Sequence, residues 1–128
     1  MAKGRGSAMN HFLVALVVLF VVQCSLVEVQ GATYVVGGPQ GWGLQIQKSR
    51  WTTGKRFKAG DVLVFKYTPG AHNVVSVNSA GYKSCTKGAS PSLTSGNDKV
   101  TLKKGGNYFI CSFTGHCTSG MKIAVTAA

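Results

Sequence analysis

Residues 108–125 have the sequence YFICSFTGHCTSGMKIAV, in which two apolar segments flank a loop rich in Gly, Ser and Thr. The first segment follows a Gly-Gly turn and ends at Cys111, and it predicts a short strand. In the second segment Met121, Ile123 and Val125 alternate with other residues, as in a half-buried β-strand. The pattern therefore predicts a strand, a loop and a second strand, with chemically reactive side chains at both strand ends.

Short strands and tight turns recur along the rest of the chain. The clearest strand is residues 62–67 (VLVFKY), which a Pro-Gly turn follows. Further strands are predicted at residues 34–36, 72–77 and 99–103, whereas 45–55 and 86–97 are expected to hold a short helix or an irregular loop. Strands and turns of this kind predict an all-β protein, a two-sheet Greek-key β-sandwich or barrel with short helical or irregular loop segments.

The N-terminus has the pattern of a secretory signal peptide. Two basic residues precede residues 12–22 (FLVALVVLFVV), an uninterrupted apolar run of eleven residues. Such a run suits a signal peptide and is shorter than the roughly 20 residues that a membrane span needs. We expect cleavage after Gly31, with a cut after Ser25 as the alternative. Residues 1–31 would then be removed, and residues 32–128 would form one domain.

The loop between the two C-terminal strands carries the second of two histidines in this domain. His116 lies five residues after Cys111 and five before Met121, and His72 begins another predicted strand far upstream. Two imidazoles, one thiolate and a weak axial thioether form the ligand set of a type 1 copper site. The same set suits both Cu(I) and Cu(II), so we predict one redox-active copper ion bound by these four residues.

The cysteine count constrains this interpretation. Cys24 lies in the predicted leader, which leaves Cys85, Cys111 and Cys117 in an oxidising compartment. If Cys111 binds the metal, then Cys85 pairs with Cys117, and the disulfide also ties down the loop that carries His116. The alternative is a structural zinc site with both Cys111 and Cys117 as ligands, which would leave Cys85 without a partner.

Charge and composition narrow the possible functions. The chain has 14 Lys and Arg and three acidic residues. Lys3, Arg5 and Glu28 lie in the leader, so the mature domain keeps 12 basic and two acidic residues and a net charge of +10. This charge favours polyanionic partners, but secretion and scattered basic residues argue against nucleic acid. With only two histidines and two carboxylates, the domain lacks residues for hydrolytic catalysis, and we expect that it is not an enzyme.

Several motifs together resemble the plant phytocyanins, and the resemblance extends over the mature chain. It is strongest to the plantacyanin, or basic blue protein, branch. The motifs are ATYVVGG from Ala32, Trp42 after a glycine, FKAGD from Phe57, HNVV from His72, and the run from Cys111 to Met121. Membership implies a cupredoxin-like fold, one type 1 copper held by His72, Cys111, His116 and Met121, and a disulfide between Cys85 and Cys117. A methionine at 121, where stellacyanins carry glutamine, disfavours that other branch.

The resemblance also implies a function and a location. We expect a secreted, monomeric protein of the apoplast or cell wall that transfers single electrons to a small redox molecule or a protein. His116 is expected at the surface, beside Phe113. Because no hydrophobic tail follows Ala128, no membrane anchor is expected. The alternative is an extracellular signalling or cell-wall-binding protein, of the reproductive-guidance type, in which copper is structural or incidental and an acidic cell-wall polysaccharide is the partner.

Overall fold

The computed structural model describes residues 31–128 of the chain. The predicted signal peptide, residues 1–31, lies outside the described residues except for Gly31, so its cleavage stays a prediction. Within the described part, no helix has both the length and the apolar character that a membrane crossing requires.

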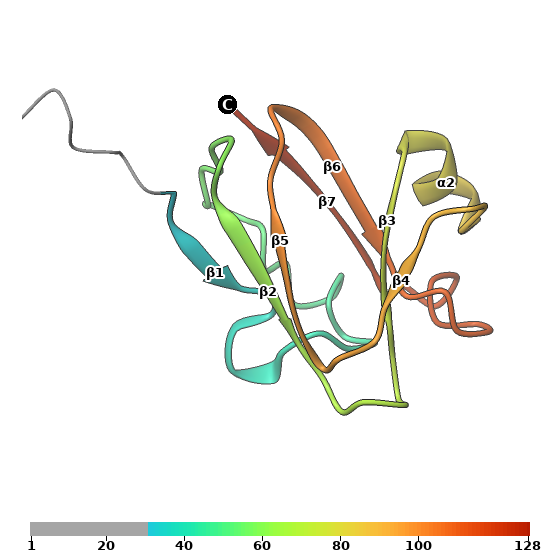
Figure 1. Cartoon of the computed structure of the whole chain (residues 1–128). Coiled ribbons are helices and arrows are strands. Elements are labelled where there is room, and N and C mark those ends of the chain that lie inside the picture. Colours follow the sequence, from blue (N-terminus) through green and yellow to red (C-terminus); the bar gives the residue numbers. More distant parts are fainter. Residues whose placement is uncertain (1–30) are drawn as a thin grey trace, which may run out of the picture.

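Two β-sheets form the body of the protein (Figure 1). The first sheet has the order β1-β2-β5, and the second has the order β4-β3-β6-β7. β1 runs parallel to β2, and the other strand pairs are antiparallel. The strands are β1 (Thr33–Val35), β2 (Val62–Lys66), β3 (Val74–Val77), β4 (Ser92–Leu93), β5 (Asn97–Thr101), β6 (Gly105–Ile110) and β7 (Lys122–Ala127). This arrangement confirms the predicted all-β, two-sheet fold.

The main core lies between the two sheets and is built around aromatic side chains. The ring of Phe65 on β2 packs at 5.1 Å from Trp42 and at 5.2 Å from Phe109 on β6, between ring centroids. Along β7, Ile123 and Val125 are buried while their neighbours are more exposed, which confirms the predicted alternation. β6 and β7 therefore each turn buried side chains towards the main core.

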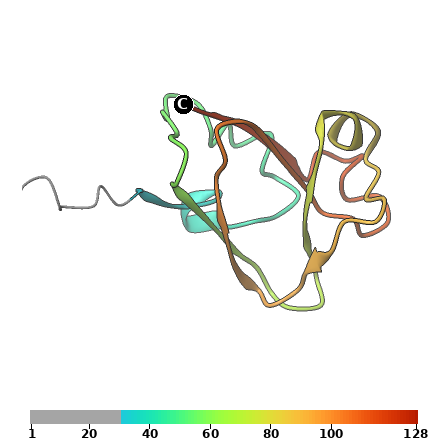
Figure 2. The ribbon, with the colours of Figure 1, turned by 45° about the horizontal axis from the view of Figure 1, so that its top comes forward.

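A second, smaller core covers the outer face of the second sheet. A short helix, α2 (Ser79–Ser84), lies beside β3 and β6 on the side away from the first sheet (Figure 2). Buried Val75 and Ile110 pack there with Cys117, and Tyr82 of the helix packs against them. The Asn78 side chain begins the helix by accepting a hydrogen bond from the Gly81 N–H at 2.8 Å.

Helix α2 was not expected from the sequence. The short helix lies at Ser79–Ser84, outside both segments where we expected a helix or loop. Residues 45–55 form a series of turns, and residues 86–97 contain the two-residue strand β4. Six residues with a glycine among them have little helical propensity of their own, so this helix depends on packing and on its cap.

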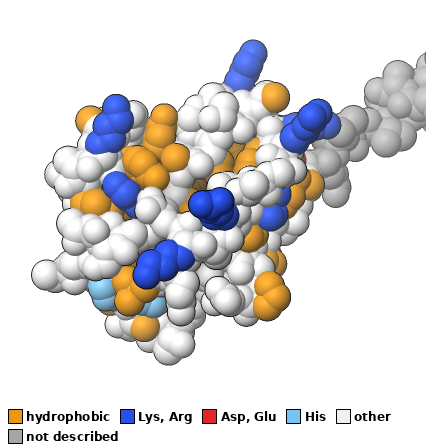
Figure 3. All heavy atoms as spheres, turned by 180° about the vertical axis from the view of Figure 1, so that it is seen from behind, with side chains coloured by type: hydrophobic (Ala, Val, Ile, Leu, Met, Phe, Trp, Pro, Cys, Tyr) orange, Lys and Arg blue, Asp and Glu red, His pale blue; other side chains and the backbone are white. Residues whose placement is uncertain are grey.

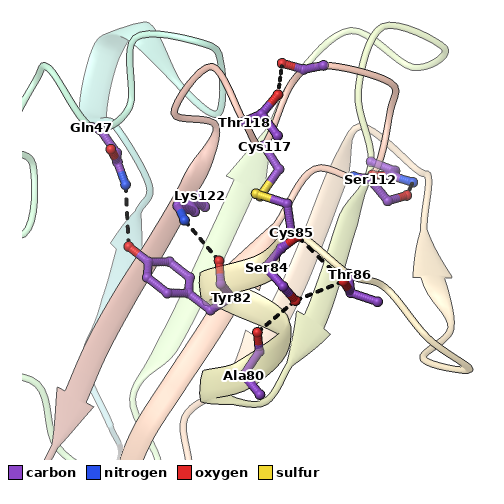
Figure 4. The surroundings of a disulfide bond; sticks show 12 residues. Gln47, Ala80, Tyr82, Ser84, Cys85, Thr86, Ser112, Cys117, Thr118 and Lys122 are labelled. Carbon is purple, nitrogen blue, oxygen red and sulfur yellow. Dashed lines mark hydrogen bonds between the residues drawn. A yellow bond between two sulfur atoms is a disulfide. The ribbon is translucent and has the colours of Figure 1, made fainter.

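A disulfide joins Cys85, directly after α2, to Cys117 in the loop before β7 (Figure 4). The two Cα atoms lie 5.7 Å apart, within the usual range for a disulfide. The predicted pairing of Cys85 with Cys117 is therefore confirmed. It links the helix on the outer face of the sheet to the loop that carries His116.

Candidate metal centre

The strand ends of the second sheet position the sulfur ligands. Cys111 directly follows β6 and Met121 directly precedes β7, and both residues are fully buried. The Cys111 N–H donates a hydrogen bond to the Met121 carbonyl at 3.1 Å, so the register of the two strands continues into the site. Rigid β-structure therefore holds both sulfur-bearing residues.

The loop between these residues folds back on itself and brings His116 to them. The His116 N–H donates to the Phe113 carbonyl at 3.0 Å, and the His116 carbonyl accepts from the Met121 N–H at 2.9 Å. Gly115 and Gly120 have φ of +79° and +106°, a backbone region that residues with a Cβ adopt at a steric cost. The glycines of the predicted loop thus permit the turns that position the histidine.

Three predicted ligands converge. One donor atom from each of His72, Cys111 and His116 lies within 4.8 Å of the other two. The two Nδ1 atoms of the histidines are 3.1 Å apart, and Cys111 Sγ is 3.4 Å from His116 Nδ1. Metal bonds of about 2.0 Å to nitrogen and about 2.3 Å to sulfur allow such separations around one ion. The donor set fits a soft metal that accepts imidazole and thiolate together, as copper does.

The disulfide decides between the two metal sites that the sequence left open. Because Cys117 is bonded to Cys85, it is not available as a thiolate ligand. Cys111 is a free, buried cysteine. The four-ligand zinc site with both Cys111 and Cys117 is therefore wrong, and the one-thiolate, two-imidazole site stands with Met121 beside it.

Asn73 braces the site, and the sequence assigned it no role. Its side chain is buried, donates to Ser112 Oγ at 2.7 Å and accepts from the Ser112 N–H at 2.8 Å. Its backbone carbonyl accepts the indole N–H of Trp42 at 2.9 Å. Asn73 follows His72 and Ser112 follows Cys111, so these bonds join the two ligand-bearing segments. The sequence does hold one signal for this role: Asn73 is a polar residue between the predicted ligand His72 and a buried strand.

The surroundings keep His72 in the form that binds metal. Burial lowers the pKa of His72, and the charge of nearby His116 lowers it further. The imidazole is therefore neutral at pH 7, with a lone pair free for a metal. Tyr67, whose ring centroid lies 6.4 Å from that of His72, has its pKa raised to about 12 by burial and by its hydrogen bond to Asp98. The neighbouring phenol therefore stays neutral as well.

Both ligand histidines reach the surface, as we expected for His116. Each is half-buried, and the Phe113 ring lies 5.7 Å from that of His116. A hollow of about 320 Å³ adjoins His72 and includes Leu44, whose side chain is 46% exposed. The histidines lie at one edge of the molecule, with apolar side chains around them (Figure 3).

Comparison with known proteins agrees with this geometry. The plastocyanin-like domain family matches residues 42–121. The chain is 52% identical over 132 residues to chemocyanin of Lilium longiflorum, with all of both chains covered. It is also 52% identical over 132 residues to basic blue protein of Arabidopsis thaliana, with 99% of each covered. The solved structure of cucumber basic protein, a blue copper protein, matches with a TM-score of 0.72 and 52% identity, over 76% of this chain and 100% of that chain.

The fold and the site together define a blue copper protein with a cupredoxin-like fold. Within that class, the chain belongs to the phytocyanin family, in its plantacyanin or basic blue protein branch. His72, Cys111, His116 and Met121 are positioned as its type 1 copper site.

Proposed function

We propose that this chain is a secreted electron-transfer protein that carries one electron at a time. Bound type 1 copper supplies the exchange of one electron between Cu(I) and Cu(II). The observation that carries the proposal is the convergence of His72, Cys111 and His116 at one end of the sandwich. The thiol there is fully buried, whereas both rings are half-exposed.

The residues around the site hold its shape in both redox states. Asn73 and Ser112 tie the segment of His72 to that of Cys111, and the Cys111 backbone is bonded to that of Met121. Ligands held in this way move little when the charge of the metal changes, and a small rearrangement favours rapid electron transfer. Burial of Cys111 also keeps water and oxidants from the thiolate.

The exposed edges of the histidines provide the route between the site and a partner. Phe113 lies beside His116, and Leu44 lies beside the hollow next to His72. An apolar surround lets a small redox molecule or a protein make close, brief contact with an imidazole. We propose that the protein acts as a monomer and is a carrier and not an enzyme.

Copper loading tests the proposal directly. The purified protein with Cu(II) is expected to show an intense blue thiolate-to-copper band that ascorbate bleaches and ferricyanide restores. Cys111→Ser should abolish the band, whereas Ser119→Ala, an exposed change in the same loop, should keep it. A protein that stays colourless with bound copper, or a blue protein that neither reagent affects, would contradict electron transfer.

Secretion to the cell wall is part of the same proposal. The apolar run at residues 12–22 and the small residue Gly31 support a cleaved leader. N-terminal sequencing of protein collected from the apoplast of expressing plant cells should begin at Ala32. A mature chain that keeps the apolar run would contradict cleavage.

A second candidate function is extracellular signalling or cell-wall binding, with copper structural or incidental. Similarity over the full chain to a protein named chemocyanin supports this candidate, as does the net positive charge. A guidance assay should compare the parent protein with copper-free Cys111→Ser. Equal activity supports the signalling function, whereas loss of activity together with copper supports electron transfer.

A further inference from the structure

The described surface carries positive charge with no side-chain carboxylate to balance it. The described residues include 12 Lys and Arg and two acids, Asp61 and Asp98, which are only 3% and 8% exposed. Backbone N–H groups of Ala32 and Lys58 bond to Asp61, while Ser95 and Tyr67 bond to Asp98. Both carboxylates are thus used internally, and basic side chains lie over the face shown in Figure 3.

One hollow combines this charge with aromatic rings. It has a volume of about 260 Å³ and lies between α2, the start of β7 and the turns that follow Gly43. We name it the Arg50 groove, after the exposed guanidinium at its side. Its lining combines apolar, polar, aromatic and basic side chains, among them Ile46, Gln47, Arg50, Trp51, Tyr82 and Lys122.

Arg50 adopts a left-handed backbone conformation within a turn. Its φ is +50°, and Cys85 is the only other residue besides glycine with positive φ in the described part of the chain. Cys85 ends α2 and forms the disulfide, whereas Arg50 is exposed in a turn. No hydrogen bond within the described residues uses the Arg50 guanidinium. The turn accounts for the φ of Arg50, since its N–H donates to the Gln47 carbonyl and its carbonyl accepts from the Thr53 N–H, and the exposed guanidinium keeps its five N–H donors for solvent or a ligand.

Lys122, Tyr82 and Gln47 also line the Arg50 groove, and hydrogen bonds join them (Figure 4). The Lys122 ammonium donates to the Tyr82 carbonyl at 2.9 Å and lies 4.4 Å from the ring centroid of that residue. Gln47 donates its amide N–H to the Tyr82 hydroxyl at 3.3 Å. An ammonium has three donors, so two remain for a ligand after this bond is made. The lysine is therefore pre-positioned as a fixed positive charge.

We propose that the Arg50 groove binds a uronate residue of an acidic polysaccharide. A planar carboxylate matches the fork of the Arg50 guanidinium, which can donate two parallel hydrogen bonds to it. Trp51 and Tyr82 add apolar contact for a sugar ring, and the ammonium groups of Lys55 and Lys122 lie 5.0 and 4.4 Å from their ring centroids. Further carboxylates along the polymer are then attracted electrostatically to the exposed lysines outside the groove. Binding of a cell-wall polysaccharide has a physiological role only if the protein is secreted, as proposed above. The binding itself does not require copper.

Calorimetric titration with a short oligogalacturonate tests the groove. We expect Arg50→Gln to weaken binding about tenfold, and Arg50→Lys to weaken it measurably because a point charge replaces the fork. The control is Lys104→Gln, the same change of charge at the turn before β6. Lys104 lies by the far end of the β6–β7 pair from Lys122, since Gly105 pairs with Ala127 and Lys122 with Ile110. We expect this control to change affinity by less than about twofold.

Two outcomes would overturn the proposal. Equal losses for Arg50→Gln and Lys104→Gln would show diffuse attraction to the whole charged surface. Equally tight binding of a single-stranded RNA, with the same dependence on Arg50, would show a general anion site. The fully methyl-esterified oligosaccharide should bind at least about tenfold more weakly, since it keeps the sugar rings and lacks the charge.

The groove and the copper site can be tested apart. Cys111→Ser should bind the oligogalacturonate as the parent does, because Cys111 does not line the groove. Arg50→Gln should keep the blue band of the copper-loaded protein. Loss of the band in Cys111→Ser with unchanged binding would support both proposals, and a blue parent that does not bind the oligomer would overturn only the groove.

Discussion

Asn73 and Ser112, which are 39 positions apart in the sequence, share two hydrogen bonds of 2.7 and 2.8 Å. One side chain thus satisfies both a hydroxyl and a backbone N–H on the segment that bears the thiol ligand. The relationship joins β3 to the end of β6 at the point where the metal ligands diverge from the sheet. It accounts for how His72, just before β3, and Cys111, at the end of β6, keep a common geometry.

Asn73→Ala should therefore destabilise the protein and loosen the site. The change leaves the Ser112 N–H without its buried acceptor, which costs about 1–3 kcal/mol of the free energy of unfolding. We also expect the blue band to shift or broaden, because the two ligand segments are no longer joined. Chemical denaturation and visible spectroscopy measure the two effects.

Ser112→Ala is the matched control for that experiment. It leaves the buried Asn73 amide N–H without its acceptor at 2.7 Å, which costs about 1–3 kcal/mol, but it keeps the Ser112 N–H bond to Asn73 that joins the two ligand segments, so the blue band should change less than in Asn73→Ala. The role assigned to Asn73 would be wrong if both variants kept the parent spectrum and the parent stability.

Met121→Leu should change the potential more than the stability. Met121 is fully buried, and a swap of similar volume costs less than about 1.5 kcal/mol. Removal of the soft axial sulfur should raise the reduction potential, because Cu(II) loses a donor. Met121→Gln, which supplies a harder oxygen, should lower it. Voltammetry of the two variants and the parent gives the direction of each change in reduction potential. Equal potentials in all three proteins would exclude Met121 as the axial neighbour.

Removal of the disulfide should weaken the fold and free the ligand loop. The bond closes a sequence separation of 32 residues, for which the chain-entropy model gives about 3–4 kcal/mol. The double variant Cys85→Ser, Cys117→Ser should lose about this much stability and should exchange the amide hydrogens of residues 112–120 faster. Unchanged exchange in that loop would mean that the backbone turns hold it without the disulfide.

Tyr67 should make the copper-free protein sensitive to alkaline pH. Its pKa is raised from 10 to about 12, mainly by burial and next by the bond to Asp98. The unfolded chain therefore releases this proton first, and stability that is complete below pH 10 falls as the pH rises through 12. Tyr67→Phe should flatten the decline between pH 10 and 12 in denaturation experiments. A decline as steep as in the parent would assign the effect to other groups.

Arg50→Gly should stabilise the protein while it weakens polyuronate binding. Glycine adopts a φ of +50° without the steric cost of a Cβ, which is on the order of 1 kcal/mol. Thermal unfolding measures the gain and titration measures the loss. A glycine variant that is less stable than the parent would show that the arginine side chain contributes to folding.

The sequence predicted the parts of this structure that local spacing controls. Cys111, His116 and Met121 lie within one strand–loop–strand unit, so their convergence depends on a short piece of chain. The alternation along β7 was visible because one face of that strand is buried and the other is not. The cysteine count left one pairing once Cys111 was taken as the ligand, and the structure has that pairing.

Features that depend on distant partners were not predictable from the sequence. Helix α2 is six residues long and contains Gly81, and it is held by Tyr82 on the outer core and by the disulfide after it. The bracing role of Asn73 requires knowledge of its partner Ser112 on another strand end. The positive φ of Arg50 is likewise a property of the folded turn, and no pattern of residue types marks it.

The inward placement of both carboxylates affects how two copies of this protein meet. Surfaces that bear only positive side chains repel one another within a Debye length, about 10 Å at 0.1 M salt. Under the proposed electron-transfer function, we expect electron self-exchange between copies to be slow in dilute salt and to quicken as the salt concentration rises. A polyanion that neutralises the lysines would bring copper sites close enough to exchange electrons along its length. In such a matrix electrons would pass between neighbouring bound copies, and the protein would not need to diffuse to its partner.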